Sequence, residues 1–247
     1  MISRRRFIAV GSTGLLAACD RLNSSQAFRG VLRSAEGLTM RAQRLVSPRD
    51  ALAREYGEAD MSPIFRSNGT SMPGTSEYAK HLAESFANWR LDVDGLVSRP
   101  LSIPIQTLRG MPHRVQITRH DCVEGWSAIG KWHGVQLSKI LDAAGLSTRA
   151  RYIVFHCADR FSDKPYYESI DLIDAFHPQT ILAFGMNDHL LPVANGAPLR
   201  LRVERQLGYK HAKYIQRIEA VESLAGIFGG KGGYWEDNVD YEWYAGI

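Results

Sequence analysis

The segment Thr118–Ser127 has the sequence TRHDCVEGWS, and its thiol is Cys122. Ionisable side chains stand on both sides of this cysteine, namely Arg119, His120, Asp121 and Glu124. Such surroundings are typical of a reactive or metal-binding cysteine, because thiolate is a soft ligand and nearby cations favour the deprotonated form. The alternative is a structural cysteine, since a free thiol often packs as a small core hydrophobe.

The N-terminus indicates where the protein works. A twin arginine, Arg4-Arg5, precedes a short apolar stretch over residues 7–18. That stretch is shorter than the roughly 20 residues of a membrane-spanning helix and is typical of a signal peptide. The motif at residues 16–19, LAAC, resembles a bacterial lipobox, which would make Cys19 a lipid anchor.

Residues 1–18 are therefore predicted to be a twin-arginine, lipoprotein-like signal. This export route carries proteins that are already folded, and Asp20 after the lipobox favours the periplasmic side of the bacterial inner membrane. The alternative is a simple secretory signal with a chance cysteine at Cys19.

Charge and cysteine content limit the function classes. The formal charge of the 247-residue chain is +4, but it falls to +1 when the three arginines of the signal are removed, so no nucleic-acid partner is expected. After Cys19, only Cys122 and Cys157 remain. An oxidising compartment permits a bridge between them, so both a disulfide and two free thiols stay open.

Residues 19–65 are polar and rich in arginine, and we expect an irregular tether there. Residues 66–247 are expected to form one domain, with a loop at residues 68–74, NGTSMPG, where turn-forming residues gather. Alternation and short apolar runs predict strands at residues 89–95, 115–118, 152–156, 166–170, 180–186, 189–192, 199–203 and 214–221.

Helical signals are fewer and shorter. Apolar spacing predicts a helix over residues 137–144 that ends at Gly145, and Asp171 begins a helical turn. Asn187-Asp188 predicts a hairpin turn. Residues 199–203 alternate apolar and basic, which predicts a strand with one solvent- or ligand-facing side. Strands and short helices mix without regular βαβ units, so the predicted class is α+β.

Three segments carry a resemblance to a known family. Residues 119–127, followed by Trp132-His133-Gly134-Val135 and Leu137, resemble the metal-cysteine segment of the sulfite oxidase family. Residues 195–201 and 208–213 resemble its pterin-binding segments, in the same order and with similar spacing. The resemblance spans about residues 85–225 and is strongest to bacterial members that reduce methionine sulfoxide.

The resemblance implies a sulfite-oxidase-type fold that holds one molybdenum per chain through molybdopterin and the thiolate of Cys122. It also implies which residues contact the pterin and its phosphate, namely Asn68, Cys157, Asn195, Arg200, His211, Ala212 and Lys213. An arginine fork and a lysine charge suit a phosphate. The alternatives are an exposed charged strand face for Arg200 and Arg202, and a solvated basic turn for Lys210 and Lys213.

Several positions depart from the family pattern. Cys157 stands where the sulfoxide-reducing members have threonine, and the residues after Asn68 also differ from theirs. Asp121 occupies the position of an arginine. Because a sulfite dianion needs cations beside the metal, acidic neighbours favour a neutral small substrate such as a sulfoxide or N-oxide.

The predicted catalytic residues are Cys122, Arg119, His120 and Glu124, with His120 or Glu124 handling protons. The chain has no Cys-x-x-Cys-His haem motif. Its length is also expected to leave no room for a haem domain or an extra dimerisation domain. Electrons would therefore come from a separate partner, either a cytochrome or a membrane haem protein.

Two other functions remain open at this stage. A cysteine hydrolase would pair Cys122 with His120, His133 or His156, although no cysteine-protease signature surrounds the thiol. A non-catalytic binding lipoprotein would keep the fold and lose the metal. The aromatic tail over residues 234–244 either covers the cofactor or a partner surface, or packs on the domain.

Overall fold

A computed structural model describes residues 25–247. The predicted signal, Cys19 and Asp20 therefore lie outside the described residues. The chain divides into two compact units, residues 1–48 and residues 49–247. Within residues 25–247, no helix is both long and apolar enough to cross a membrane.

The described part of the first unit is helix α2 (Gln26–Val46) rather than the predicted irregular tether. Ser25 caps its start, where the hydroxyl accepts a hydrogen bond from the Phe28 amide at 3.4 Å. Val31, Leu38 and Leu45 recur every seven residues, which is helical spacing. The scattered arginines obscure this pattern in the sequence, and arginine is itself a good helix former.

The second unit begins at Arg49, whereas the predicted domain began at residue 66. Residues 49–65 join the fold through backbone hydrogen bonds, for example from the Tyr56 amide to the Ile117 carbonyl at 2.9 Å and from the Ser62 amide to the Ile129 carbonyl at 3.0 Å. Phe65 also packs edge-on against buried Trp132, with ring centroids 5.2 Å apart.

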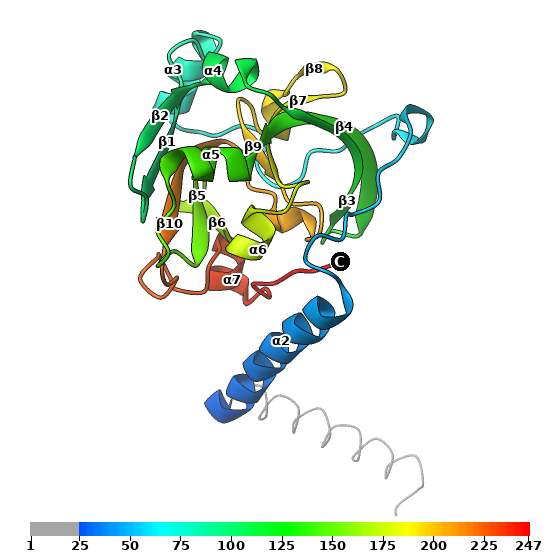
Figure 1. The fold of residues 1–247 in the computed structure, drawn as a ribbon, viewed down its shortest axis with the longest axis vertical. Helices are drawn as coiled ribbons and strands as arrows, with labels where there is room; N and C mark the ends of the chain where they lie inside the picture. Colours follow the sequence, from blue (N-terminus) through cyan, green and yellow to red (C-terminus); the bar gives the residue numbers. More distant parts are fainter. Residues whose placement is uncertain (1–24) are drawn as a thin grey trace, which may run out of the picture. The chain divides into compact units, whose positions relative to one another are not determined.

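The strands of this unit build two five-stranded sheets that lie on opposite sides of it in Figure 1. In chain order they are β1 (Arg90–Gly95), β2 (Leu101–Pro104), β3 (Arg114–Cys122), β4 (Trp126–Gln136), β5 (Tyr152–Phe161), β6 (Lys164–Asp171), β7 (Ile181–Met186), β8 (His189–Leu190), β9 (Arg200–Arg202) and β10 (Ile215–Val221). One sheet has the order β2-β1-β10-β5-β6, and the other has the order β3-β4-β7-β8 with β9 paired to β7. The β1–β10 pair is parallel, and all other pairs between these strands are antiparallel.

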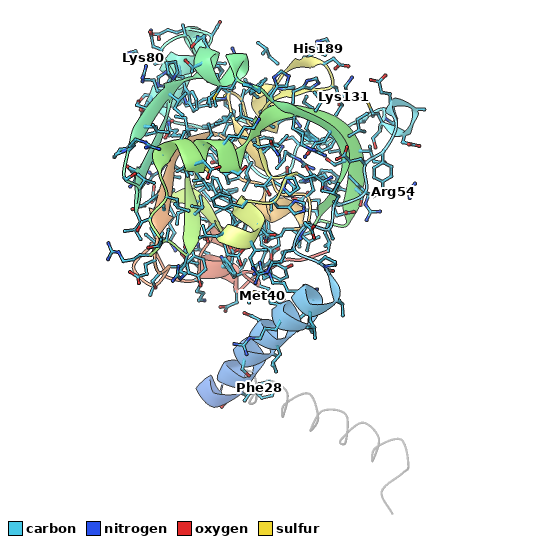
Figure 2. The ribbon with its side chains drawn as sticks, viewed as in Figure 1. Phe28, Met40, Arg54, Lys80, Lys131 and His189 are labelled. Atoms are coloured by element: carbon cyan, nitrogen blue, oxygen red, sulfur yellow. The ribbon has the colours of Figure 1, made fainter. Side chains whose placement is uncertain are left out.

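Short helices connect the strands. They are α3 (Ser76–Ala83), α4 (Ile105–Gly110), α5 (Leu137–Ala144), α6 (Leu172–Ala175) and α7 (Tyr234–Val239), with single 3₁₀ turns η1 (Glu58–Asp60), η2 (Val193–Asn195) and η3 (Gly208–Lys210). Side chains fill the interior of the unit (Figure 2), and most buried apolar ones join a single core cluster. The mixture of sheets and short helices confirms the α+β class.

Local signals in the sequence fix several of these elements. Helix α5 ends at Gly145, which has φ 69°, as the sequence predicts. Asn187 and Asp188, with φ 50° and 64°, form the turn of the β7–β8 hairpin. Strand β9 lacks the solvent-facing side that its alternation allowed, because all three of its residues are buried.

Candidate active site

Cys122 is the last residue of β3, at the tip of the β3–β4 hairpin. It pairs with Trp126 across a tight turn in which the Gly125 amide donates to the Cys122 carbonyl at 3.0 Å. Alternation along the strand buries His120 and Cys122 on one face and leaves Arg119 on the other. The hairpin therefore presents the thiol inward and the arginine outward.

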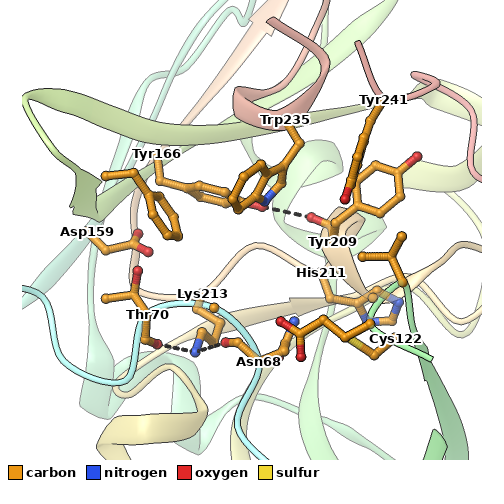
Figure 3. Close-up of a pocket in the computed structure, with 15 residues that line it drawn as sticks. Asn68, Thr70, Cys122, Asp159, Tyr166, Tyr209, His211, Lys213, Trp235 and Tyr241 are labelled. Carbon is orange, nitrogen blue, oxygen red and sulfur yellow. Dashed lines mark hydrogen bonds between the residues drawn. The ribbon is translucent and has the colours of Figure 1, made fainter. Parts of the chain in front are cut away.

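A cavity opens beside Cys122. Its lining residues are Asn68, Gly69, Thr70, Cys122, Val123, Glu124, Asp159, Phe161, Tyr166, Gly208, Tyr209, His211, Lys213, Trp235 and Tyr241. Figure 3 separates a polar side, with Cys122, Asn68, His211 and Lys213, from a side formed by aromatic rings. Of the predicted site residues, the cavity brings together Cys122, Glu124, Asn68, His211 and Lys213.

Lys213 organises the polar side. Its ammonium donates to the carbonyls of Asn68 at 2.6 Å, Ala194 at 2.9 Å and Thr70. Burial, with Arg200 nearby, lowers the pKa of Lys213 to about 7. These three carbonyls match the three hydrogens of an ammonium group, so Lys213 holds the loop of Asn68 and Thr70 against the cavity. The alternative of a solvated basic turn is excluded, because Lys210 and Lys213 are both buried.

The electrostatic surroundings of the thiol differ from the sequence prediction. Burial, with a smaller contribution from Glu124, raises the pKa of Cys122. Arg119, the cation expected to favour the thiolate, lies outside the cavity with half of its side chain exposed. The protonated thiol is thus favoured here, and a metal ion would have to displace the proton.

Asp121, one of the two acidic neighbours of the thiol in the sequence, is turned away from the cavity. Its carboxylate pairs with the Arg119 guanidinium at 2.9 Å and accepts a hydrogen bond from the Ser127 hydroxyl at 2.5 Å, and it does not line the cavity. The cavity takes its carboxylates from Glu124 and Asp159 instead. Burial raises the pKa of Asp159 to about 6.

His120 lies on the buried face of β3 and does not line the cavity. Arg202 donates to its Nδ1 at 2.9 Å and forms a bidentate pair with Glu204 at 2.6 and 2.9 Å. Burial and the positive charge of Arg202 lower the pKa of His120 well below its ordinary value, so the ring is neutral. Because arginine only donates, the proton of this imidazole resides on Nε2.

Gly208 packs against this imidazole so closely that it has no room for a side chain. A Cβ at this position would lie 2.5 Å from the Nε2 atom of His120. The glycine in the predicted pterin segment is thus required by a close approach between η3 and β3.

Arg200 and Asn195 form a buried pair near the polar side. The Arg200 guanidinium donates to the carbonyls of Asn195 at 3.0 Å and His211 at 3.4 Å, and it lies 5.0 Å from the ring centroid of Trp132. Burial and neighbouring Arg202 lower the pKa of Arg200 to about 9. The alternative of an exposed charged strand face is excluded, since both arginines are fully buried.

The remaining predicted residues lie outside the cavity lining. Cys157 is buried in β5 with its Sγ 3.8 Å from the Phe155 carbonyl, and Cys122 and Cys157 are both free thiols. Ala212 is buried and contributes its carbonyl to the Leu201 amide at 2.8 Å. The hydrolase pairings expected from the sequence find no support, because His120, His133 and His156 do not line the cavity.

Sequence reasoning missed most of the aromatic side and Asp159. These residues come from the end of β5, from β6, from η3 and from the C-terminal segment. The one available signal was the aromatic tail, whose Trp235 and Tyr241 reach the cavity. No spacing rule in the chain connects Asp159 with a tail that begins 75 residues later, at Tyr234.

The cavity suits a polar cofactor. Among the residues that line it, His211 Nδ1 and Asp159 Oδ1 are buried without a hydrogen-bond partner, and two buried residues outside the lining, Arg200 and Asn195, have one such atom each, Nε and Nδ2. Buried polar atoms in proteins are nearly always hydrogen-bonded. A ligand with both donors and acceptors, such as a pterin, would satisfy them, so the residues present fit that group.

Comparison with known proteins supports this assignment. A family model described as "Oxidoreductase molybdopterin binding domain" matches residues 79–226. The chain is 36% identical over 242 residues to the putative protein-methionine-sulfoxide reductase subunit YedZ1 of Azospira oryzae, a match that covers 98% of this chain and 86% of the relative.

Two catalytic subunits of protein-methionine-sulfoxide reductase match over a smaller part of this chain. The identity is 36% to the Xanthomonas campestris protein and 33% to the Campylobacter jejuni protein, over 65% and 57% of this chain and 52% of each relative.

Among solved structures, the sulfane dehydrogenase SoxCD from Paracoccus pantotrophus has a similar fold. The TM-score is 0.51 at 22% identity, over 56% of this chain and 39% of that one. The family model and the Azospira oryzae relative, which matches 98% of this chain, together establish the family. This chain belongs to the sulfite oxidase family of molybdopterin-binding oxidoreductases.

Proposed function

We propose that this protein removes the oxygen atom from a neutral sulfoxide. The S–O bond breaks and the sulfoxide takes up two electrons and two protons, giving a thioether and water. The observation that carries the proposal is the thiol of Cys122 at a cavity whose remaining charged groups are two carboxylates and one carbonyl-bound lysine. Three related proteins whose names specify methionine-sulfoxide reduction support the same direction.

The cofactor implied by the family would be one molybdenum with molybdopterin per chain. When bound, it supplies a metal centre that exchanges two electrons and an oxygen atom. Cys122 would be the protein ligand to the metal. The residues expected at the pterin are Asn68, Cys157, Asn195, Arg200, His211, Ala212 and Lys213, of which Cys157 is buried in β5 outside the cavity lining.

Glu124 is the group best placed to move a proton. Its carboxylate lines the cavity two residues after Cys122 and accepts a hydrogen bond from the Trp126 indole at 3.1 Å. His120 is less suited, because its ring is neutral and lies behind the cavity wall. Arg119 would act only from the outer face of β3.

Sulfite is the less favourable substrate because of two carboxylates in the cavity, one of which, Asp159, is not among the acidic residues that the sequence places beside Cys122. Asp121 turns away, but Glu124 and Asp159 both face the cavity. The lysine that could offset them, Lys213, directs its hydrogens to backbone carbonyls. A dianion would meet repulsion here that a neutral sulfoxide does not.

Electrons would arrive from a separate redox protein, either a cytochrome or a membrane haem protein. Export by the twin-arginine route and lipidation at Cys19 would place the enzyme on the periplasmic side of the inner membrane. The motifs at residues 4–5 and 16–19 support this part of the proposal.

The test compares steady-state turnover by molybdenum-loaded protein in two assays. One assay supplies sulfite and an electron acceptor, and the other supplies sulfoxides and a reduced viologen dye. We expect sulfoxide reduction to be the faster reaction, and Cys122→Ser protein to lose activity while keeping its circular dichroism spectrum. Sulfite turnover far above that of every sulfoxide would refute the substrate, and full molybdenum content together with intact activity in Cys122→Ser would refute the metal ligand.

A further inference from the structure

The aromatic side of the cavity consists of Phe161, Tyr166, Tyr209, Trp235 and Tyr241. These rings contact one another. The ring centroids of Trp235 and Tyr241 are 6.0 Å apart in a stacked arrangement, and those of Tyr209 and Tyr241 are 5.1 Å apart, edge to face. Figure 3 shows Trp235, Tyr209 and Tyr241 across the cavity from the polar side.

Two of the three tyrosine hydroxyls of this aromatic side are engaged. Tyr166 donates to the Tyr209 carbonyl at 2.8 Å, and Tyr209 donates to the Glu242 carbonyl at 2.6 Å. What these tyrosines offer the cavity is therefore ring surface rather than unpaired hydrogen-bonding groups. Ring surface binds apolar, aromatic or sulfur-bearing groups.

The C-terminal segment that supplies Trp235 and Tyr241 is anchored between these two residues and beyond them. In α7, buried Glu236 pairs with Lys210 at 2.7 Å. Beyond Tyr241, the Trp243 indole donates to the Ser169 hydroxyl at 2.9 Å, and the Ala245 carbonyl accepts from the Leu207 amide at 2.9 Å. A wall held in this way is preformed, so it can discriminate between ligands without first becoming ordered.

We infer that the aromatic side is the subsite for the organic substituents of the sulfoxide, and that Trp235 and Tyr241 determine which sulfoxides are accepted. This inference rests on the proposed function. Cys122 and His211, whose Nδ1 has no hydrogen-bond partner, lie at the polar side, where a cofactor is expected, and this leaves the rings to face the substrate. The preferred substrates are uncharged sulfoxides with an aromatic or large apolar group.

The experiment measures kcat/KM for methyl phenyl sulfoxide and for dimethyl sulfoxide with loaded enzyme and a reduced viologen dye. The wild-type protein should prefer methyl phenyl sulfoxide. Trp235→Ala and Tyr241→Leu should each lower that preference by about fivefold or more, because the phenyl group loses an aromatic contact, whereas Trp235→Phe should keep most of it. Phe228→Ala removes an exposed ring outside the cavity and should leave the preference unchanged.

A binding measurement separates substrate recognition from catalysis. Methyl phenyl sulfone, which resembles the substrate, is titrated into loaded protein by calorimetry, and molybdenum and pterin contents are measured on the same samples. We expect weaker sulfone binding by Trp235→Ala with unchanged cofactor content.

The outcomes distinguish the two proposals. Absence of sulfoxide turnover by wild-type protein would refute the proposed function, whereas the sulfone titration would still decide whether the rings bind such a ligand. Loss of pterin from Trp235→Ala, with an unchanged substrate preference, would assign the rings to the cofactor and overturn the inference. An unchanged preference in both Trp235→Ala and Tyr241→Leu would overturn it as well.

Discussion

At the scale of single residues, Arg200 shows how a basic side chain can be buried without a carboxylate partner. Its guanidinium is fully buried and rests on two backbone carbonyls and the face of Trp132. Arg202 beside it has a bidentate carboxylate partner in Glu204. Burial lowers the pKa of Arg200, which means that burying its positive charge costs free energy. A bound anion would offset part of that cost.

Substituting Arg200 by alanine should therefore affect stability and cofactor retention together. We expect the Arg200→Ala change to lower the free energy of unfolding by about 2 kcal/mol, through the lost hydrogen bonds of a charged donor. The protein should also purify with less pterin, because a buried phosphate loses a cation. Urea unfolding and pterin fluorescence after oxidation measure the two effects.

Arg217→Ala is the matched control, since Arg217 is more exposed and pairs with Asp94 at 2.7 Å. This variant should change the free energy of unfolding by less than about 1 kcal/mol and leave the pterin content unchanged. Arg200→Ala protein that keeps all its pterin under mild denaturant would show that Arg200 serves the fold alone.

At the scale of elements, an ion cluster joins β6, η3 and α7. Lys210 is fully buried between Glu168 and Glu236, and it pairs with both. Burial and the neighbouring charge of Glu236 raise the pKa of Glu168 well above its ordinary value. Two carboxylates facing one ammonium explain why one of them favours its protonated form.

A raised folded-state pKa has a defined effect on stability. Glu168 contributes stability that is fully present below its ordinary pKa and is lost as the pH rises through the raised value. Glu168→Gln removes this titration. We therefore expect the variant to be less stable than wild type near about pH 5, and equally or more stable near about pH 8.

Urea unfolding at the two pH values checks this prediction, and Glu222→Gln, at an exposed position, is the control. Lys210 stays charged across this window, because its two carboxylates raise its pKa above the ordinary value. A constant difference between Glu168→Gln and wild type at both pH values would contradict the assignment of the proton to Glu168.

At the scale of the whole molecule, the proposed twin-arginine route is one that accepts a folded protein with its cofactor. Replacing Arg4 and Arg5 by lysine should leave unprocessed protein in the cytoplasm, since the twin arginine is the expected export signal. Cell fractionation and the size of the precursor report the outcome.

Cys19→Ala separates lipidation from export. We expect this variant to lose its lipid and its membrane attachment while still receiving the cofactor. Membrane fractionation equal to that of wild type would show that the LAAC motif at residues 16–19 is accidental.

The sequence by itself determined the features that depend on local chemistry. Gly145 ended α5, Asn187 and Asp188 turned a hairpin, and Asp171 capped α6, because caps and turns are set by neighbouring residues. The order of the segments at residues 119–127, 195–201 and 208–213 was enough to identify the family, since these motifs are read along the chain. Alternation of strands and short helices gave the α+β class.

Only the tertiary structure decided which way each side chain points and what it meets. Strand pairing turned Asp121 outward toward Arg119 and Ser127. Packing buried Arg200 and Lys213, although a basic side chain by itself suggests a solvent-exposed position. The aromatic side of the cavity combines residues from 161 to 241, and no local pattern records contacts over such separations. Local rules depend on a few adjacent residues, whereas a cavity forms only when distant elements pack together.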